Sequence, residues 1–250
     1  MYFRALRSAA VKILSDFTTS STKSETTESK PKTDSEVSLV ATSNVKTYAE
    51  EIQIYVDNFK EIAQNIVEHA SQSFVVIGFS LGGYIARSIV EQFPEKVKAL
   101  ILIASSLRSD TEEQKSQKLT AIKLNSGKNF HGLSSISIEK TLHPSNVQNR
   151  ALVKRIQEMG RTLGYEEFVK QSMLDRSSYD MSKITCPTLI ISGADDQLRS
   201  KEEAIELLDQ LPHAKLEIIK NTGHMIPIEQ PKSLASVIST WLSEKNLGSS

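Results

Sequence analysis

The chain has 250 residues, enough for one well-packed domain and too few to require a second. Its 30 lysines and arginines balance its 30 aspartates and glutamates, so no net charge favours nucleic acid or an anionic surface as a partner. The single cysteine, Cys186, excludes an internal disulfide, and no metal-ligand spacing surrounds it. No apolar stretch reaches the roughly 20 residues that cross a bilayer, so no integral membrane association is expected.

Residues 1–44 are predicted to lie largely outside the folded core. In residues 1–14, apolar side chains recur at helical spacing among basic ones, which indicates a short terminal helix. The same basic, acid-poor composition is typical of a transit peptide, so we expect a cytoplasmic protein, with mitochondria or another organelle as the alternative. Residues 15–36 are polar and predicted to be disordered, and residues 36–41 are the one candidate strand in this part.

A long helix is predicted next, over residues 47–70. Thr47 and Glu50 have the spacing of a capping box, which marks a helix start. Apolar residues then recur at steps of three and four, as on one buried helix face: Tyr48, Ile52, Tyr55, Phe59, Ile62, Ile66 and Ala70.

Four short apolar runs follow, at residues 74–77, 99–103, 188–191 and 216–219. They lack the alternation of a half-exposed strand, and helical patterns at residues 81–93, 202–211 and 231–242 lie between or after them. This order predicts an α/β fold with a mostly parallel sheet flanked by helices. Its core would comprise residues 45–105 and 184–245.

Residues 106–183 interrupt the core and read as several short helices without a strand. An insertion of this length beside a parallel sheet is usually a cap over a pocket. Its apolar residues would mostly pack the cap helices together, while some could line a pocket for a modest acyl chain or ring: Met159, Phe168, Met173 and Leu174.

A serine lies between the first apolar run and the helix after it. Ser80 is flanked by Gly78 and Gly82, so a tight strand-to-helix turn can close and expose the hydroxyl. The N–H of Leu81 opens the helix and would point at an oxyanion forming on a substrate carbonyl. The sequence therefore predicts Ser80 as a nucleophile and Leu81 as an oxyanion donor.

An acid and a histidine follow the last two apolar runs, where ligands of parallel sheets gather. His224 is predicted to be the general base, and a carboxylate is needed to orient its imidazole. Asp195 and Asp196 compete for this role. We favour Asp196 and expect Asp195 to make the turn or cap the helix beginning near Ser200.

The other histidines receive no catalytic role. His131 and His143 lie in the insertion and are weak pocket candidates, whereas His69 and His213 are expected to be ordinary surface residues.

These motifs together resemble the α/β-hydrolase family, and most closely its small esterases and lactonases. The resemblance rests on the turn at Ser80 and on residues 187–196 and 223–231, and it covers about residues 45–245. Family members have a gap of three between a glycine and the acid, which maps onto Gly193 and Asp196. The resemblance implies a serine hydrolase for a carboxylic ester, thioester or lactone, acting through an acyl-enzyme without a cofactor. Acyl transfer to another acceptor would use the same residues.

The sequence departs from the family in its first part. The family has four strands there and a His-Gly loop whose backbone supplies a second oxyanion donor, yet no glycine precedes Gly78. We therefore treat the fold as N-terminally incomplete, and a truncated or alternative product as one hypothesis. The alternative function is a catalytically impaired or inactive remnant acting through binding or assembly. The exposed edge of the strand at residues 74–77 would be covered by the N-terminal segment, used for self-association, or left open.

Overall fold

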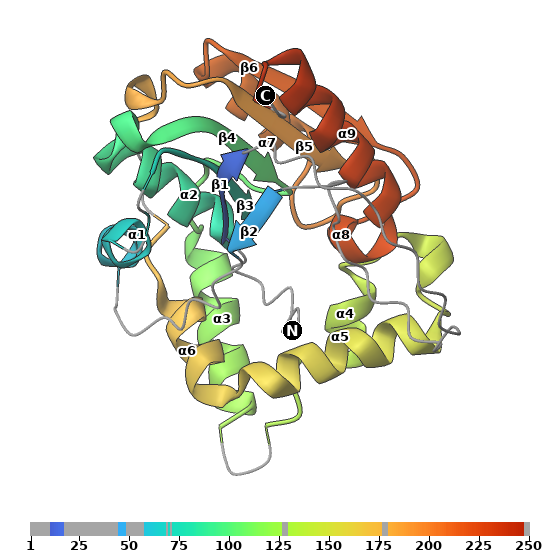
Figure 1. Ribbon diagram of the computed structural model, residues 1–250. Coiled ribbons are helices and arrows are strands. Elements are labelled where there is room, and N and C mark those ends of the chain that lie inside the picture. Colours follow the sequence, from blue (N-terminus) through green and yellow to red (C-terminus); the bar gives the residue numbers. More distant parts are fainter. Residues whose placement is uncertain are drawn as a thin grey trace, which may run out of the picture.

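The computed structural model describes two N-terminal strands by their backbone and then residues 58–68, 70, 72–126, 130–176 and 180–247. Its centre is a six-stranded sheet in the order β2-β1-β3-β4-β5-β6 (Figure 1). The strands are β1 (Val11–Phe17), β2 (Val45–Tyr48), β3 (Phe74–Phe79), β4 (Val97–Ile103), β5 (Thr188–Gly193) and β6 (Ala214–Ile219).

The four apolar runs form the parallel part of the sheet. β3 pairs with β4, β4 with β5 and β5 with β6, all in parallel. Because β3 to β5 are covered on both faces, the apolar residues in their central parts are continuous rather than alternating. The predicted α/β class with a parallel sheet is confirmed.

Helices cover both faces of the sheet. α1 (Phe59–Glu68), α2 (Leu81–Gln92) and α7 (Lys201–Gln210) contribute to one apolar cluster, whereas α8 (Ile226–Glu229) and α9 (Pro231–Glu244) contribute to the other. Successive residues of a strand point to opposite faces. Leu100 and Leu102 therefore join the first cluster, and Ile101 and Ile103 the second.

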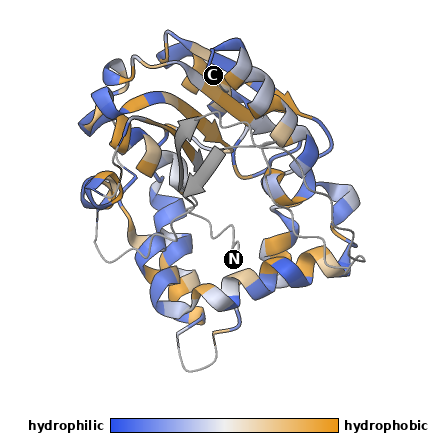
Figure 2. Ribbon diagram, viewed as in Figure 1, coloured by the Kyte–Doolittle hydropathy of each residue, from blue (hydrophilic) through white to orange (hydrophobic). Residues whose placement is uncertain are grey.

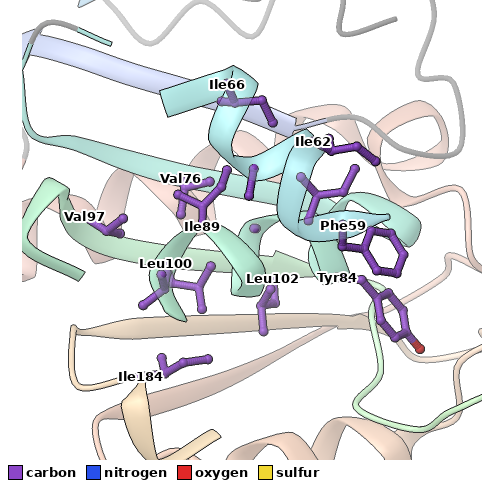
Figure 3. Close-up of a cluster of buried hydrophobic side chains, with 14 of the residues drawn as sticks. Phe59, Ile62, Ile66, Val76, Tyr84, Ile89, Val97, Leu100, Leu102 and Ile184 are labelled. Carbon is purple, nitrogen blue, oxygen red and sulfur yellow. The ribbon is translucent and has the colours of Figure 1, made fainter. Parts of the chain in front are cut away.

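The first cluster places α1 above α2 and the sheet. Figure 3 shows Phe59, Ile62 and Ile66 of α1 facing α2, which carries Tyr84 and Ile89. The strands of this region are mostly hydrophobic in Figure 2, as a buried sheet requires.

The segment between β4 and β5 is the helical insertion (residues 106–183). Its helices are α3 (Glu112–Leu124), α4 (Ser135–Glu139), α5 (Arg150–Leu163) and α6 (Tyr165–Met173), with 3₁₀ turns at Pro144–Asn146 and Met181–Lys183. Its described residues contain no strand. In the part of the chain that the structure describes, no helix is both long and apolar enough to cross a membrane.

The N-terminal predictions need correction. Val11–Phe17 form β1, so the short helix expected over residues 1–14 is wrong from Val11 onward, and the disordered segment expected from residue 15 is wrong up to Phe17. Val45–Tyr48 form β2, so the long helix does not begin at Thr47. These residues are rich in β-branched and aromatic side chains, which suit a strand when a partner is present. The candidate strand at residues 36–41 lies outside the described residues.

β1 supplies the partner that the edge of β3 was expected to need. It pairs antiparallel with β3, Val11 opposite Gly78 and Leu14 opposite Val75, and antiparallel with β2 on its other side. Of the three arrangements considered for this edge, the described residues therefore adopt the first, coverage by the N-terminal segment.

Candidate functional site

Ser80 occupies the turn between β3 and α2 with a strained backbone. Its φ of 52° and ψ of −114° are uncommon for a residue with a side chain. Its own N–H donates to the carbonyl of Ile103 at 2.8 Å, which ties the turn to β4. A Cβ on Gly78 would lie only 2.7 Å from the Cα of Gly83, so this position of the turn leaves no room for a side chain.

Ser80, His224 and Asp196 form a continuous hydrogen-bond chain. The Ser80 Oγ lies 2.9 Å from the His224 Nε2, and the His224 Nδ1 lies 2.9 Å from the Asp196 Oδ2. The side chains of His224 and Asp196 are only 8% and 0% exposed, so water scarcely competes for the second bond. The structure thus brings together the three residues that the sequence singled out.

The other oxygen of Asp196 fixes the carboxylate in place. Asp196 Oδ1 accepts hydrogen bonds from the backbone N–H groups of Leu198 and Arg199, at 2.8 and 2.9 Å. Asp196 therefore makes the turn as well as meeting His224. Asp195 lies in the turn after β5, as expected, which the Asp196 N–H closes by donating to the Gly193 carbonyl at 3.4 Å. It does not cap α7, which is capped by Ser200 in a capping box with Glu203.

The loops that carry Asp196 and His224 touch through glycines. A Cβ added to Gly193, at the end of β5, would overlap the carbonyl oxygen of Gly223 and lie 2.8 Å from that of Thr222. The N–H of Asp195 donates to the Thr222 carbonyl at 3.1 Å. This close backbone approach brings the acid within reach of the imidazole.

The helical insertion also holds the histidine. The Thr141 carbonyl, beyond α4, accepts the N–H groups of His224 and Met225 at 2.8 and 3.2 Å. The ring of Phe79 lies 5.4 Å from the imidazole, centroid to centroid, at a tilt of 40°. Sequence reasoning missed Thr141 and also Glu229, whose carboxylate binds the loop before His224. Their contacts are tertiary; only the position of Glu229, five residues after the histidine, is visible locally.

The remaining histidines separate into two groups. His143 Nε2 lies 3.5 Å from Asp195 Oδ2, and its Nδ1 lies 2.7 Å from the Ser145 hydroxyl, so it joins the insertion to the loop after β5. His131 and His213 are exposed, and His69 lies outside the described residues. None of the described histidines other than His224 has a hydrogen bond to Ser80.

Leu81, which the sequence predicts to be an oxyanion donor, follows Ser80 directly in the chain. Leu81 is the first residue of α2, where the N–H has no carbonyl one turn earlier to bind. The helix dipole adds partial positive charge at the same point. Within the described residues, no group of three or more histidine, cysteine or acidic side chains is placed to hold a metal ion.

The four apolar residues noted in the insertion lie in different environments. Leu174 is buried in the first cluster, Met159 packs against the second, and Met173 is 58% exposed. Phe168 stacks on Phe130 with ring centroids 5.3 Å apart. Only Phe168 thus shows the expected packing within the insertion, whereas Leu174 and Met159 pack into the two main apolar clusters.

Comparison with known proteins gives consistent relatives. A monoacylglycerol lipase of Xenopus laevis is 27% identical over 69% of this chain and 55% of its own length. A pimeloyl-acyl-carrier-protein methyl ester esterase of Yersinia enterocolitica is 21% identical over 76% of this chain and 77% of its own. The chain spans about half the length of the curated lipases it matches first.

Solved structures support the same fold. A thermophilic esterase from Thermogutta terrifontis superposes with a TM-score of 0.67 at 22% identity, covering 76% of this chain and 74% of that one. A family model described as serine aminopeptidase, S33, matches residues 41–231, which is more than half of the sequence. The chain belongs to the α/β-hydrolase family that this model describes.

Proposed function

We propose that the protein is a serine hydrolase for a carboxylic ester, thioester or lactone. The observation that carries the proposal is the hydrogen-bond chain from Ser80 through His224 to Asp196, with both bonds at 2.9 Å and the second one buried. This arrangement is what a serine needs to lose its proton to a neighbouring base at neutral pH.

The reaction would begin with attack of the Ser80 oxygen on the substrate carbonyl. His224 Nε2 takes the hydroxyl proton, and Asp196 accepts the Nδ1–H and stabilises the imidazolium. The Leu81 N–H donates to the negative oxygen of the tetrahedral intermediate. The bond from the carbonyl carbon to the leaving oxygen or sulfur then breaks, and His224 gives its proton to that atom. An acyl-enzyme on Ser80 remains.

Water completes the cycle. His224 removes a proton from a water molecule, whose oxygen attacks the acyl carbonyl. The second tetrahedral intermediate collapses, the carboxylic acid leaves, and the proton on His224 returns to Ser80. No atom changes its oxidation state in this cycle, so the reaction needs no redox partner.

The names of the relatives favour an ester as the substrate. One is a monoacylglycerol lipase and another a methyl ester esterase. Both reactions release an alcohol from a carboxylic ester. A small, weakly charged ester would also suit a chain whose formal net charge is zero.

An inactive or impaired remnant is the second candidate, and one observation favours it. No glycine precedes Gly78, so the sequence lacks a counterpart of the family's His-Gly oxyanion loop. Loss of one oxyanion donor costs about 3–4 kcal/mol, or roughly a hundred- to a thousandfold in rate. The remnant would then act through binding or assembly.

The test is hydrolysis of p-nitrophenyl butyrate by the full chain beside Ser80→Ala. We expect the variant to lose at least about a thousandfold in kcat/KM, because the acyl-enzyme cannot form. Ser105→Ala is the matched control, since Ser105 is buried two residues beyond β4 and its hydroxyl has no hydrogen-bond partner in the described structure.

A fluorophosphonate probe gives an independent readout. It should label the wild-type chain at Ser80 and leave Ser80→Ala unlabelled, as located by mass spectrometry of the modified peptide. Equal background hydrolysis by both chains, with no labelling, would support the remnant instead.

A further inference from the structure

The Glu229 carboxylate accepts four hydrogen bonds from two separate segments. Its Oε1 accepts from the Gly223 N–H at 2.9 Å and the Thr222 hydroxyl at 3.2 Å. Its Oε2 accepts from the His143 N–H and the Asn146 side-chain amide, both at 2.8 Å. A carboxylate offers about four lone-pair sites, so these donors use its whole capacity.

The two segments are the histidine loop (residues 221–225) and the insertion turn (residues 141–146). Glu229 is the last residue of α8, which lies beside α4 and the turn after it in Figure 1. The same two segments meet directly, because the Thr141 carbonyl accepts two N–H groups of the histidine loop. A Cβ on Gly223 would lie 2.7 Å from the backbone of Leu142.

We propose that Glu229 is a positioning residue that clamps the helical insertion to the histidine loop and so holds His224 in register with Ser80. This inference rests on the proposed function, because the register matters only if His224 acts as the base. The carboxylate touches neither Ser80 nor the imidazole among the described contacts. It acts through the backbone of the histidine loop, which carries the imidazole.

Only a carboxylate can satisfy all four donors at this point. Glutamine presents one acceptor oxygen and one NH₂ donor, so its NH₂ group would face the two donors of one segment. Glu229→Gln therefore keeps one side of the clamp and loses the other, with little change in side-chain size. This makes it the sharpest variant for testing the role.

The kinetic test uses the full chain and p-nitrophenyl butyrate. Glu229→Gln should lower kcat by about 10- to 100-fold, because a small displacement of a catalytic group has an effect of that order. KM should stay within about threefold, since Glu229 lies behind the histidine loop. Glu139→Gln makes the same chemical change on an exposed residue of α4 and should retain wild-type kinetics.

The His224→Ala background separates positioning from general damage. If Glu229 acts through the imidazole, Glu229→Gln should not change the residual rate of His224→Ala. An equal loss in both backgrounds would overturn the proposal, as would wild-type kcat in the single variant or a rise in KM alone.

Hydrogen exchange tests the clamp without any activity. The amides of His224 and Met225 should exchange about tenfold faster in Glu229→Gln, the effect of losing roughly one hydrogen bond to a charged group. They should be unchanged in Glu139→Gln. Unchanged exchange in Glu229→Gln would overturn the clamp even if Ser80 proved active.

A failure of the proposed function has a different signature. In that case wild type and Ser80→Ala hydrolyse the ester equally, while exchange at His224 still responds to Glu229→Gln. Should Glu229→Gln fold poorly, Thr222→Val removes one bond to Oε1 with a side chain of matching shape. A severalfold loss of kcat is expected there, and no loss would contradict the clamp.

Discussion

Two neighbouring helices of similar length are held in opposite ways. α2 buries every residue from Leu81 to Val90, whereas α3 has no buried residue along Glu112–Leu124. α2 carries the turn with Ser80 and lies against the sheet. α3 belongs to the helical insertion, and its two faces differ little in apolar character.

Directed polar contacts replace apolar burial around α3. Thr111 caps α3 in a capping box with Gln114. Asp110, just before it, pairs with Lys118 and with Arg176, the latter at 2.8 Å. Apolar burial fixes α2 cooperatively with the sheet, whereas the polar contacts of α3 can open one at a time, so we expect α3 to move before the sheet unfolds.

The strongest test of this difference is a pair of apolar truncations. Ile89→Ala in α2 should lower the free energy of unfolding by about 2–5 kcal/mol, because the side chain is 0% exposed. Leu124→Ala in α3 should change it by less than about 0.5 kcal/mol, since Leu124 is 80% exposed. Urea denaturation measures both. Similar losses would show that α3 is held by packing after all.

The second test adds a methyl group at the point where the loops that carry Asp196 and His224 touch. Gly193→Ala should cost about 1–3 kcal/mol, because the new Cβ meets fixed backbone at Gly223. If the proposed function holds, kcat/KM should fall by roughly a hundredfold as Asp196 and His224 are forced apart. Ala194→Ser adds one atom at the exposed neighbouring residue and should affect neither quantity.

The third test breaks the ion pair that joins the residue before α3 to Arg176, which follows α6 in the same insertion. Burial lowers the pKa of the Arg176 guanidinium below its ordinary value, and Asp110 counteracts this. Asp110→Asn leaves Arg176, whose side chain is 10% exposed, without its anion and should cost about 1–3 kcal/mol. Glu113→Gln, an exposed change on α3, is the control. An unchanged melting temperature in Asp110→Asn would show that this ion pair does not stabilise the fold.

The fourth test, with the smallest expected effect, measures the reactivity of the cysteine thiol where the chain passes from the insertion into β5. Cys186 lies just before β5, and burial raises the pKa of its thiol to about 11. At pH 8 only roughly one thiol in a thousand is then ionised, against about a quarter for a free cysteine. Iodoacetamide should therefore react slowly with the folded chain and normally in urea. Rapid reaction without urea would mean that this junction opens in the native state.

Local patterns predicted the parallel part of the fold and the residues gathered at its edge. Continuous apolar runs are typical of strands buried on both faces, and glycines beside Ser80 and His224 mark the tight approaches found there. The helix boundaries of α2, α7 and α9 fall within two residues of the expected ones. These features depend on neighbours in the chain, so the sequence displays them.

The errors arose where a distant partner decides the structure. Thr47 and Tyr48 fit the start of an amphipathic helix, yet they pair with Leu14 and Ile13 of β1. No local pattern reports that pairing, because cross-strand contacts outweigh propensity. The role of Glu229 could not be predicted for the same reason, since two of its four hydrogen-bond donors lie far away in the chain, in the insertion.

The one tryptophan makes the second apolar cluster visible to spectroscopy. Trp241 of α9 is 1% exposed and shares that cluster with Ile138 and Leu142 of the insertion. Its fluorescence therefore reports on this apolar cluster, to which the sheet, α9 and the insertion all contribute. A shift of emission to longer wavelength at denaturant concentrations below the loss of circular dichroism would record water entering that layer while the strands remain paired.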